Sequence, residues 1–285
     1  MTVPWSTLVQ AEDLATRLDD HGIVIVDCRF ALGNPAAGES AYRQSHLPTA
    51  LYAHLDRDLS DHEKQGLGRH PWPDAKAFTA RLGSWGITPE SQVVAYDDGD
   101  GAHAARMWFL LRALGHDNVA VLDGGWARWA RWGALGLPVE TTIRRPRPAG
   151  YQAQFDARLL LDANQVWAHL EDGGLLLDAR ASERFRGEVE PIDRVAGHVP
   201  GAVNRPYAQN LSDGRFKSAA QLREEFRAVL GQHDPDEVVA MCGSGVTACH
   251  HLLAMQHAGL GGGRLFAPSW SGWIAAAARP IATGD

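Results

Sequence analysis

The chain has 285 residues, a formal net charge of −7 at pH 7 and a pI near 6.0. This length suffices for one large or two ordinary domains, and 45% hydrophobic with 21% charged residues predicts a normal globular core. The negative charge argues against nucleic acid or an anionic membrane as a general partner, and no apolar run approaches the ~20 residues of a membrane-spanning helix.

Short apolar runs alternate with helix-like segments along the whole chain. Such alternation predicts parallel sheets with helices on both faces. The segments expected to be helical are 13–20, 74–85 and 104–114 in the first half and 162–170, 219–230 and 246–256 in the second.

The two halves of the chain resemble each other. Each contains, in the same order, a strand ending in an acid and an arginine, a His-x-Pro turn, a valine-rich strand and a tryptophan-rich segment. Matches that recur in one order predict an internal duplication. The matched stretches are 22–29 with 174–180, 42–50 with 196–202, 93–97 with 238–242, and 124–129 with 268–273.

This duplication predicts two domains, residues 1–140 and 156–285, joined by a linker at 141–155. The linker region is rich in Arg and Pro, so we expect it to be extended and stiff rather than helical. The predicted fold class is therefore α/β, with two tandem domains that each contain a mostly parallel sheet flanked by helices.

The three cysteines are Cys28, Cys242 and Cys249. An odd count without framework spacing predicts reduced thiols and a cytoplasmic protein, and the N-terminus shows no basic region followed by an apolar core, so no secretory signal is expected. Cys249, beside His250 and His251, matches no common zinc spacing. We therefore expect no metal site and place Cys249 in a helix interior.

The stretch 238–256 carries the most chemistry. A buried strand ends at Cys242, a loop with Gly243 and Gly245 follows, and a helix begins. The glycines permit backbone angles that aim successive N–H groups into one concavity, Thr247 is placed to cap or brace the first helical turn, and the helix N-terminus adds a positive dipole. These features stabilise a thiolate, the nucleophilic form of cysteine. The alternative is a buried structural cysteine.

The loop 242–248 excludes one cysteine chemistry and resembles another. A cysteine phosphatase needs an arginine where this loop has Ala248, so phosphate and arsenate chemistry is disfavoured. The loop resembles the active-site loop of the rhodanese family and is closest to its 3-mercaptopyruvate sulfurtransferase branch, because the thiosulfate-preferring branch carries Arg and Lys in place of Gly243 and Ser244. Asp97 stands at the cysteine position of the first half, so the resemblance implies two tandem rhodanese-like domains, a silent one followed by a catalytic one.

The same resemblance implies a donor-binding wall at residues 184–194, before the His-Val-Pro-Gly-Ala signature at 198–202. In the mercaptopyruvate branch, two arginines from this region hold the carboxylate and carbonyl of the donor, as arginine can through paired hydrogen bonds. Arg184 matches the first, Arg194 is our choice for the second, and Arg186 is its rival. The alternative is that these are surface arginines of a charged loop.

The resemblance further implies a catalytic triad of Cys242, Ser244 and Asp56, in which Asp56 comes from the other domain and orients Ser244. Asp56 is the second acid of a family Asp-x-Asp pattern whose first acid is His54 here. His70 matches a further pocket position. The loop residues implied to bind the donor are Gly243, Gly245, Val246 and Thr247.

Together these residues predict a sulfurtransferase that moves sulfane sulfur from 3-mercaptopyruvate through a Cys242 persulfide to an acceptor and releases pyruvate. The expected acceptors are cyanide, glutathione or a thiol such as reduced thioredoxin; no cofactor or metal is implied. One alternative donor is thiosulfate, disfavoured because Gly243 and Ser244 supply no charge for a dianion. Another alternative is a non-catalytic sulfur-relay or regulatory binding module, which would not need Cys242.

Overall fold

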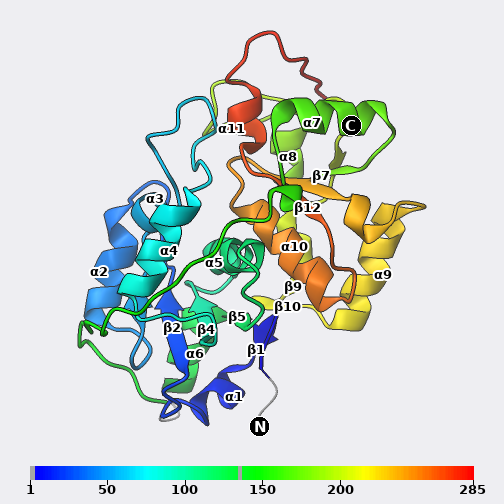
Figure 1. Cartoon of the computed structure of the whole chain (residues 1–285). Helices are drawn as coiled ribbons and strands as arrows, with labels where there is room; N and C mark the ends of the chain where they lie inside the picture. The colour runs from blue at the N-terminus through cyan, green and yellow to red at the C-terminus, as the bar shows by residue number, and fades with distance from the viewer. Residues whose placement is uncertain (1–3, 134–136) are drawn as a thin grey trace. The chain divides into compact units, whose positions relative to one another are not determined.

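The computed structural model describes residues 4–133 and 137–285 (Figure 1). The chain divides into two compact units, and the division does not follow chain order alone. The first unit extends to Ser60 and adds Pro73–Phe155 and Asp213–Arg215, whereas the second consists of Asp61–Trp72, Asp156–Ser212 and Phe216–Asp285. The segment Asp61–Trp72, which the sequence places in the first domain, therefore belongs to the second unit.

The first unit is built on a five-stranded sheet in the order β1-β5-β4-β2-β3, with every pair parallel. Its strands are β1 (Leu8–Val9), β2 (Ile23–Asp27), β3 (Leu51–Tyr52), β4 (Gln92–Tyr96) and β5 (Val119–Leu122). Its helices are α1 (Ala11–Ala15), α2 (Ala36–Gln44), α3 (Leu55–Asp58), α4 (Ala75–Ser84), α5 (Ala102–Ala113) and α6 (Gly125–Gly133).

The second unit repeats this sheet, in the order β6-β12-β11-β7-β8 and again with every pair parallel. Its strands are β6 (Leu160–Leu161), β7 (Leu176–Asp178), β8 (Val203–Asn204), β11 (Val239–Met241) and β12 (Arg264–Phe266), and β9 (Leu211–Ser212) pairs separately with β10 (Arg215–Phe216). Its α-helices are α7 (Ala163–Glu171), α8 (Ser182–Phe185), α9 (Ala219–Leu230), α10 (Thr247–His257) and α11 (Ser269–Trp273), and its 3-10 turns are η1 (Ala157–Leu159), η2 (Tyr207–Asn210) and η3 (Pro235–Glu237).

The two sheets correspond strand by strand, which confirms the predicted duplication and the parallel α/β fold. In the first, Asp27 of β2 pairs with Tyr96 of β4; in the second, Asp178 of β7 pairs with Met241 of β11. The carboxyl ends of parallel strands meet at one edge of a sheet, where open α/β folds bind ligands. The residue that follows the central strand at this edge is an aspartate in one unit and Cys242 in the other.

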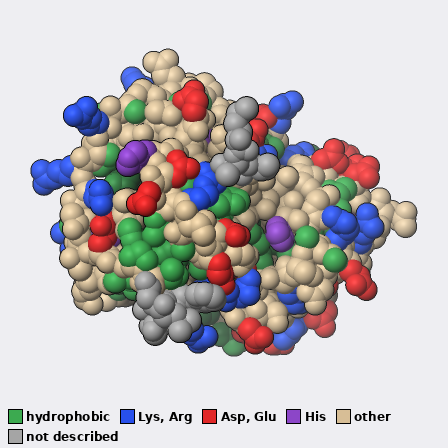
Figure 2. Space-filling model, turned by 90° about the horizontal axis from the view of Figure 1, so that it is seen from below, with side chains coloured by type: hydrophobic (Ala, Val, Ile, Leu, Met, Phe, Trp, Pro, Cys, Tyr) green, Lys and Arg blue, Asp and Glu red, His purple; other side chains and the backbone are tan. Residues whose placement is uncertain are grey.

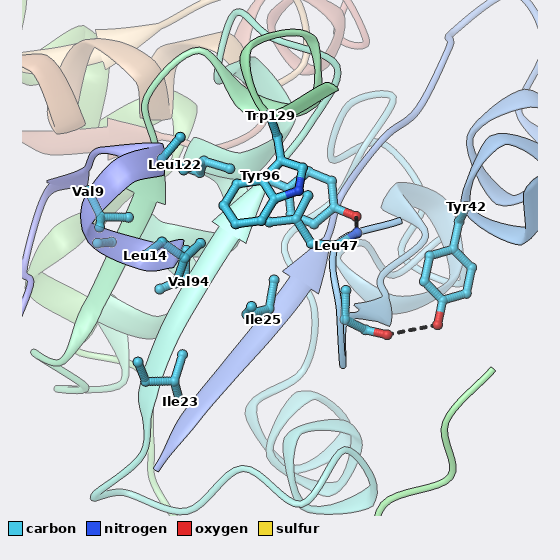
Figure 3. Packing of buried hydrophobic residues seen from close by; sticks show 13 residues of the cluster. Val9, Leu14, Ile23, Ile25, Tyr42, Leu47, Val94, Tyr96, Leu122 and Trp129 are labelled. Carbon is cyan, nitrogen blue, oxygen red and sulfur yellow. Dashed lines mark hydrogen bonds between the residues drawn. The ribbon is translucent and has the colours of Figure 1, made fainter. Parts of the chain in front are cut away.

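The core of the first unit follows the two-residue period of its strands. Ile23 and Ile25 of β2 point to the same face as Val94 and Tyr96 of β4, as Figure 3 shows. Trp129 of α6 closes this face and is fully buried. On the other side, α5 packs against β4 and β5. Helices on both faces explain why these strands are apolar almost throughout.

The second unit alternates its side chains between two cores in the same way. Leu176 of β7 enters one core with residues of α7 and α11, and Leu175 and Leu177 enter the other with residues of α9 and α10. Trp270 and Trp273 of α11 belong to the first of these cores. The catalytic candidate at the end of β11 is thus carried by a strand packed on both faces, a rigid base for a reactive loop.

A buried aspartate–arginine pair lies at the end of the second strand in each unit. Arg29 Nη2 donates to Asp27 Oδ2 at 2.7 Å, and Arg180 Nη2 donates to Asp178 Oδ2 at 2.6 Å. Each arginine also donates to a main-chain carbonyl and lies over a tryptophan ring. The acid–arginine strand ends noted in the sequence are therefore structural clamps that tie each sheet edge to its neighbouring loops.

Two local expectations can be compared with the structure. The segment expected as a helix at 13–20 is wrong in its bounds, since α1 covers Ala11–Ala15 and turns follow it. The Arg- and Pro-rich residues 141–150 contain neither helix nor strand, as expected.

Figure 2 shows one face of the molecule, on which acidic and basic side chains are interspersed. None of the helices in the described parts of the chain has the length and apolar character needed to cross a membrane.

Candidate active site

Cys242 lies between the end of β11 and the start of α10, in a loop whose every residue is buried. Its side chain is 2% exposed, and its Sγ atom accepts the N–H of Gly245 at 3.1 Å. The α10 N-terminus begins directly after the loop, so the positive end of the helix dipole lies next to this position. The sulfur atom thus lies at the junction of strand, loop and helix, within reach of a main-chain donor.

The first turn of helix α11 holds the loop in place through hydrogen bonds. The Oγ of Ser269 accepts the N–H of Cys242 at 3.1 Å, and the N–H of Trp270 donates to the Cys242 carbonyl at 3.0 Å. The N–H of Ser271 donates to the carbonyl of Gly243 at 2.9 Å. These bonds use the loop's outward-facing main-chain groups and fix its conformation before any ligand arrives.

The two loop glycines serve different purposes. Gly245 has a φ of +76°, and a Cβ atom there would lie 2.3 Å from the carbonyl oxygen of Ala267, so both the backbone angle and the space require glycine. Gly243 is not among the positive-φ residues, so the expectation that it supplies an unusual backbone angle is wrong. A Cβ atom at Gly243 would instead lie 3.1 Å from Nη2 of Arg69.

Thr247 is the first residue of α10 rather than its cap. The N-cap is Val246, whose side chain makes no capping hydrogen bond. The expected capping role of Thr247 is therefore wrong, and the donors at this helix start are main-chain groups. Cys249, one turn further on, is fully buried with its Sγ directed to the carbonyl of Gly245 at 3.3 Å, as expected for a packed helix residue.

Ser244 is paired with a histidine from the segment Asp61–Trp72. Its Oγ and Nδ1 of His70 share a hydrogen bond of 2.8 Å, and both side chains are buried. The partners are 174 positions apart in the sequence but lie in the same unit. A hydroxyl bonded to an imidazole beside a cysteine can move a proton at that place.

Two arginine side chains lie beside Gly243. Arg184 of α8 is one of them, with both terminal nitrogens 3.7 Å from the position of a Cβ atom there; Arg69 is the other. Glu190 binds Arg184 at 2.8 Å, and Asp193 binds Arg69 at 2.6 Å and Arg184 at 3.2 Å. The loop sequence alone suggested uncharged surroundings. The structure instead places two charged side chains beside the loop.

Glu190 holds its arginine as an ionised carboxylate. Burial acts to raise the pKa of Glu190, but hydrogen bonds from the Asp193 amide and from Arg184 outweigh that effect and lower the pKa. Sequence reasoning missed Arg69, although it stands next to the predicted His70. No motif or periodicity marks its segment, and only the tertiary structure brings it to the loop.

The other two candidate arginines lie elsewhere. Arg194 donates through Nη2 to the carbonyl of Ile274, just after α11. Arg186 pairs with Glu188 at 2.8 Å at the surface. The structure thus brings Arg184 to the loop, and the contacts of Arg194 and Arg186 are with other groups.

Asp56 lies in the first turn of α3 in the first unit, and its pairing with Ser244 stays a prediction. Its neighbour His54, which replaces the family's first acid, is the N-cap of this helix. The Nδ1 atom of His54 accepts the N–H of Asp56 at 3.1 Å, and Asp58 accepts the N–H of His54 at 2.8 Å. His54 therefore caps α3, because its ring nitrogen accepts a main-chain N–H of the first helical turn.

Asp97 occupies the position of Cys242 in the first unit, and four main-chain N–H groups donate to its carboxylate. Burial raises the pKa of Asp97, with Asp100 as a lesser cause, and the amide hydrogen bonds oppose that rise. The strand–loop–helix junction of this unit thus gathers main-chain donors, and a carboxyl group of the chain itself accepts from them. The donors are Gly99 and Gly101 at 3.0 Å, His103 at 2.9 Å and Ala104 at 3.1 Å.

Within the described residues, no group of three or more His, Cys, Asp or Glu side chains is placed to hold a metal ion. The site brings together a buried cysteine whose Sγ accepts a main-chain N–H, a serine–histidine pair and two arginines.

Comparison with known proteins gives one family for both halves. The model of the rhodanese-like domain matches residues 10–131 and again residues 162–276. A probable 3-mercaptopyruvate sulfurtransferase of Pseudomonas aeruginosa is 51% identical over 98% of this chain and 98% of its own. A putative thiosulfate sulfurtransferase, SseB, of Mycobacterium tuberculosis is 39% identical over 97% of each chain.

Solved structures agree with the sequence comparison. The crystal structure of SseA from Escherichia coli, one of the 3-mercaptopyruvate sulfotransferases, superposes with a TM-score of 0.80 at 29% sequence identity. The match covers 94% of this chain and 100% of that one. The tandem architecture expected from the sequence is therefore confirmed across nearly the whole chain.

Proposed function

This chain belongs to the rhodanese family of sulfurtransferases, and from that premise we propose that it transfers sulfur from 3-mercaptopyruvate through a persulfide on Cys242. The observation that carries the proposal is the position of Cys242: at the end of the central strand, with Sγ accepting a loop N–H and a helix N-terminus behind it. The 51% identity to a probable 3-mercaptopyruvate sulfurtransferase supports this donor.

The reaction begins with the Cys242 thiolate, which attacks the sulfur atom of the donor. An S–S bond forms, the C–S bond breaks, and its electron pair leaves on carbon as the enolate of pyruvate. The proton of the donor thiol neutralises that carbon, so the products are pyruvate and a Cys242 persulfide anion. An acceptor then removes the outer sulfur and restores the thiolate, which gives ping-pong kinetics.

The main-chain N–H groups of the loop stabilise the charge that develops in these steps. Asp97 supports this assignment, because the equivalent junction of the first unit donates four N–H groups to a carboxylate. The first unit has no nucleophile at this position, so we assign catalysis to the second unit. The persulfide takes the place that the carboxylate of Asp97 fills in the first.

Ser244 and His70 move the proton between the donor's sulfur and the leaving carbon. Their 2.8 Å hydrogen bond and their burial beside Cys242 support this role. Asp56 is assigned to orient Ser244, as the resemblance to the family implies.

The acceptor is a small nucleophile, either cyanide or a thiol such as glutathione or reduced thioredoxin. The three cysteines are free thiols, which supports a reducing compartment, and we place the enzyme in the cytoplasm. No organic cofactor takes part in either half of this reaction.

Thiosulfate is the second candidate donor, and one observation favours it. Arg69 and Arg184 lie beside Gly243 and bring positive charge to a loop that carries none of its own. Asp193 and Glu190 pair with these arginines and offset that charge, so the site suits a monoanionic donor better than a dianion.

The test is the intact mass of the protein after brief incubation with either donor and no acceptor. We expect a gain of one sulfur atom with 3-mercaptopyruvate, no gain in Cys242→Ser, and an unchanged gain in the matched control Cys28→Ala. A gain with thiosulfate alone would replace the donor and keep the mechanism. No gain with either donor would contradict the proposal and favour a binding module.

A further inference from the structure

We infer that Arg69 is the second arginine that binds the carboxylate of the sulfur donor, acting with Arg184 across Gly243. This inference rests on the proposed function and adds a residue to its site. A Cβ atom at Gly243 would lie 3.1 Å from Nη2 of Arg69 and 3.7 Å from Nη1 and Nη2 of Arg184. Two guanidinium groups therefore meet over the residue that directly follows Cys242.

The segment that carries Arg69 is held to the loop's own support. The N–H of Arg69 donates to the Oγ of Ser271 at 2.9 Å, and the N–H of Ser271 donates to the Gly243 carbonyl at 2.9 Å. The neighbouring His70 bonds Ser244. Its own main-chain bond and that of its neighbour thus place Arg69 at the wall of the site, and its side chain is only partly exposed.

Asp193 aligns the two arginines. Its carboxylate accepts from Nη1 of Arg69 at 2.6 Å and from Nη2 of Arg184 at 3.2 Å, and its side chain is 5% exposed. A carboxylate that bridges two guanidinium groups fixes their planes and leaves Nη2 of Arg69 directed at Gly243. Asp193 is a positioning residue in this arrangement, because it acts on the donor only through the arginines.

The chemistry of the donor fits a pair of arginines at this place. 3-Mercaptopyruvate carries carboxylate and keto oxygens side by side, and two guanidinium groups can donate to both while Cys242 reaches the sulfur atom. Arg194 and Arg186 are engaged elsewhere, with the Ile274 carbonyl and with Glu188. Among the candidate arginines, the geometry therefore selects Arg69 and Arg184.

Gly243 sets the space for this pair. At 3.1 Å, a methyl group on residue 243 would press on the guanidinium of Arg69, which would have to move by a few tenths of an ångström. A long cationic side chain at this position would displace Arg69 outright. The absence of a side chain at residue 243 is thus a specificity feature of the donor site.

The experiment compares two donors that differ only in the carboxylate: 3-mercaptopyruvate and mercaptoacetone. We expect Arg69→Met to lower kcat/KM for 3-mercaptopyruvate by about 10- to 100-fold, the range for loss of a hydrogen bond to a charged group, and to change that for mercaptoacetone by less than about 3-fold. Arg69→Lys should recover part of the loss. The matched control Arg186→Met should alter neither donor.

Equal losses on both donors would overturn the inference, because they would indicate a structural role, and so would the absence of any loss. If Arg69→Met fails to fold, judged by its thermal unfolding, Gly243→Ala is the second variant. It removes no charged side chain and should lower the preference for the carboxylate donor, as Arg69→Met should, whereas an unchanged preference would count against the inference.

Failure of the proposed function can be told apart from failure of this inference. Wild-type protein that gains no sulfur from either donor would contradict the function alone. Titration of Cys242→Ser with pyruvate tests Arg69 without turnover: adding Arg69→Met should weaken pyruvate binding by about 10-fold or more. Equal binding by the two proteins would overturn the inference whatever the activity.

Discussion

The hydrogen bond between Ser244 and His70 shows how much of this site depends on single residues. It joins a loop residue to a histidine 174 positions earlier, and both side chains are buried beside the nucleophile. A buried polar pair loses more than its own bond when one partner is removed, because the other is left unsatisfied. We therefore expect the pair to act as one group, both in folding and in the proposed proton transfer.

This coupling predicts the outcome of a double-mutant cycle. We expect Ser244→Ala and His70→Gln each to slow persulfide formation by about 100-fold or more, the usual effect of removing an acid–base group. The double variant should be little slower than either single one, since both remove the same proton path. Single-turnover rates of pyruvate release measure the effect. Multiplicative losses in the double variant would show two independent roles.

At the scale of elements, the turn from β11 into α10 determines where the sulfur lies. Gly245 combines a φ of +76° with an approach of 2.3 Å between a potential Cβ atom and the Ala267 carbonyl. Gly173 has a similar φ of +80°, but nothing lies within 4 Å of its potential Cβ atom. At Gly173 a side chain would therefore meet only backbone strain, whereas at Gly245 it would meet both backbone strain and a steric clash.

Alanine at each position gives the corresponding prediction. Gly173→Ala should cost about 1 kcal/mol of unfolding free energy and leave persulfide formation unchanged, because only the left-handed backbone is penalised. Gly245→Ala should cost more and abolish the gain of sulfur, since the loop must move away from Ala267. Urea denaturation and intact mass check the two effects. Normal sulfur loading of Gly245→Ala would contradict this account of the loop.

Most of the longer helices could be predicted from the sequence to within two residues, because their apolar period and their boundary residues indicate the same helix ends. The helices α4, α7 and α10 are examples. Helix α2 was not predicted, and Gly38 in its first turn shows why: a Cβ atom there would lie 1.9 Å from the Arg29 carbonyl oxygen. A tertiary contact requires the glycine, and glycine lowers the local helix propensity.

The candidate site divides in the same way. Cys242, Ser244 and Gly245 form a contiguous motif, so the sequence was enough to propose them. Arg69 was not proposed, because its segment has no regular structure and reaches its partners across long sequence separations, such as 202 positions to Ser271. Gly243 was proposed for the wrong physical reason. Gly243 matters because its missing side chain leaves room for the guanidinium group of Arg69, and not because of its backbone angle.

At the scale of the whole molecule, buried histidines link folding to pH. Burial, followed by the charge of Arg205, lowers the pKa of His251 to about 3. Its ring is bonded to the Arg205 carbonyl at 2.6 Å and to Asn210 at 3.0 Å. Burial also lowers the pKa of His116 and His169. The folded protein therefore resists protonation that the unfolded chain accepts near pH 6.5.

The sign of the pH dependence follows. A group whose pKa is lower in the folded state stabilises the fold above the unfolded pKa, and that stability is lost as the pH falls toward the folded value. We expect the titration of His251 alone to lower the unfolding free energy by about 2 kcal/mol when the pH falls from 8 to 5. Urea denaturation at both pH values should show a smaller difference in His251→Gln and an unchanged one in the exposed control His21→Gln. Equal pH dependence of the unfolding free energy in wild type and His251→Gln would contradict this role of His251.

The membership of Asp61–Trp72 in the second unit has a genetic consequence. Duplication of a gene normally yields two halves that can later be parted, each with its own site. Here Arg69 and His70 are encoded in the first half, while Ser244 and Asp193, their partners, are encoded in the second. A break of the gene at the linker would leave Cys242 on a fragment without either residue. The second half expressed alone would therefore lack two residues of the site that surrounds its own cysteine.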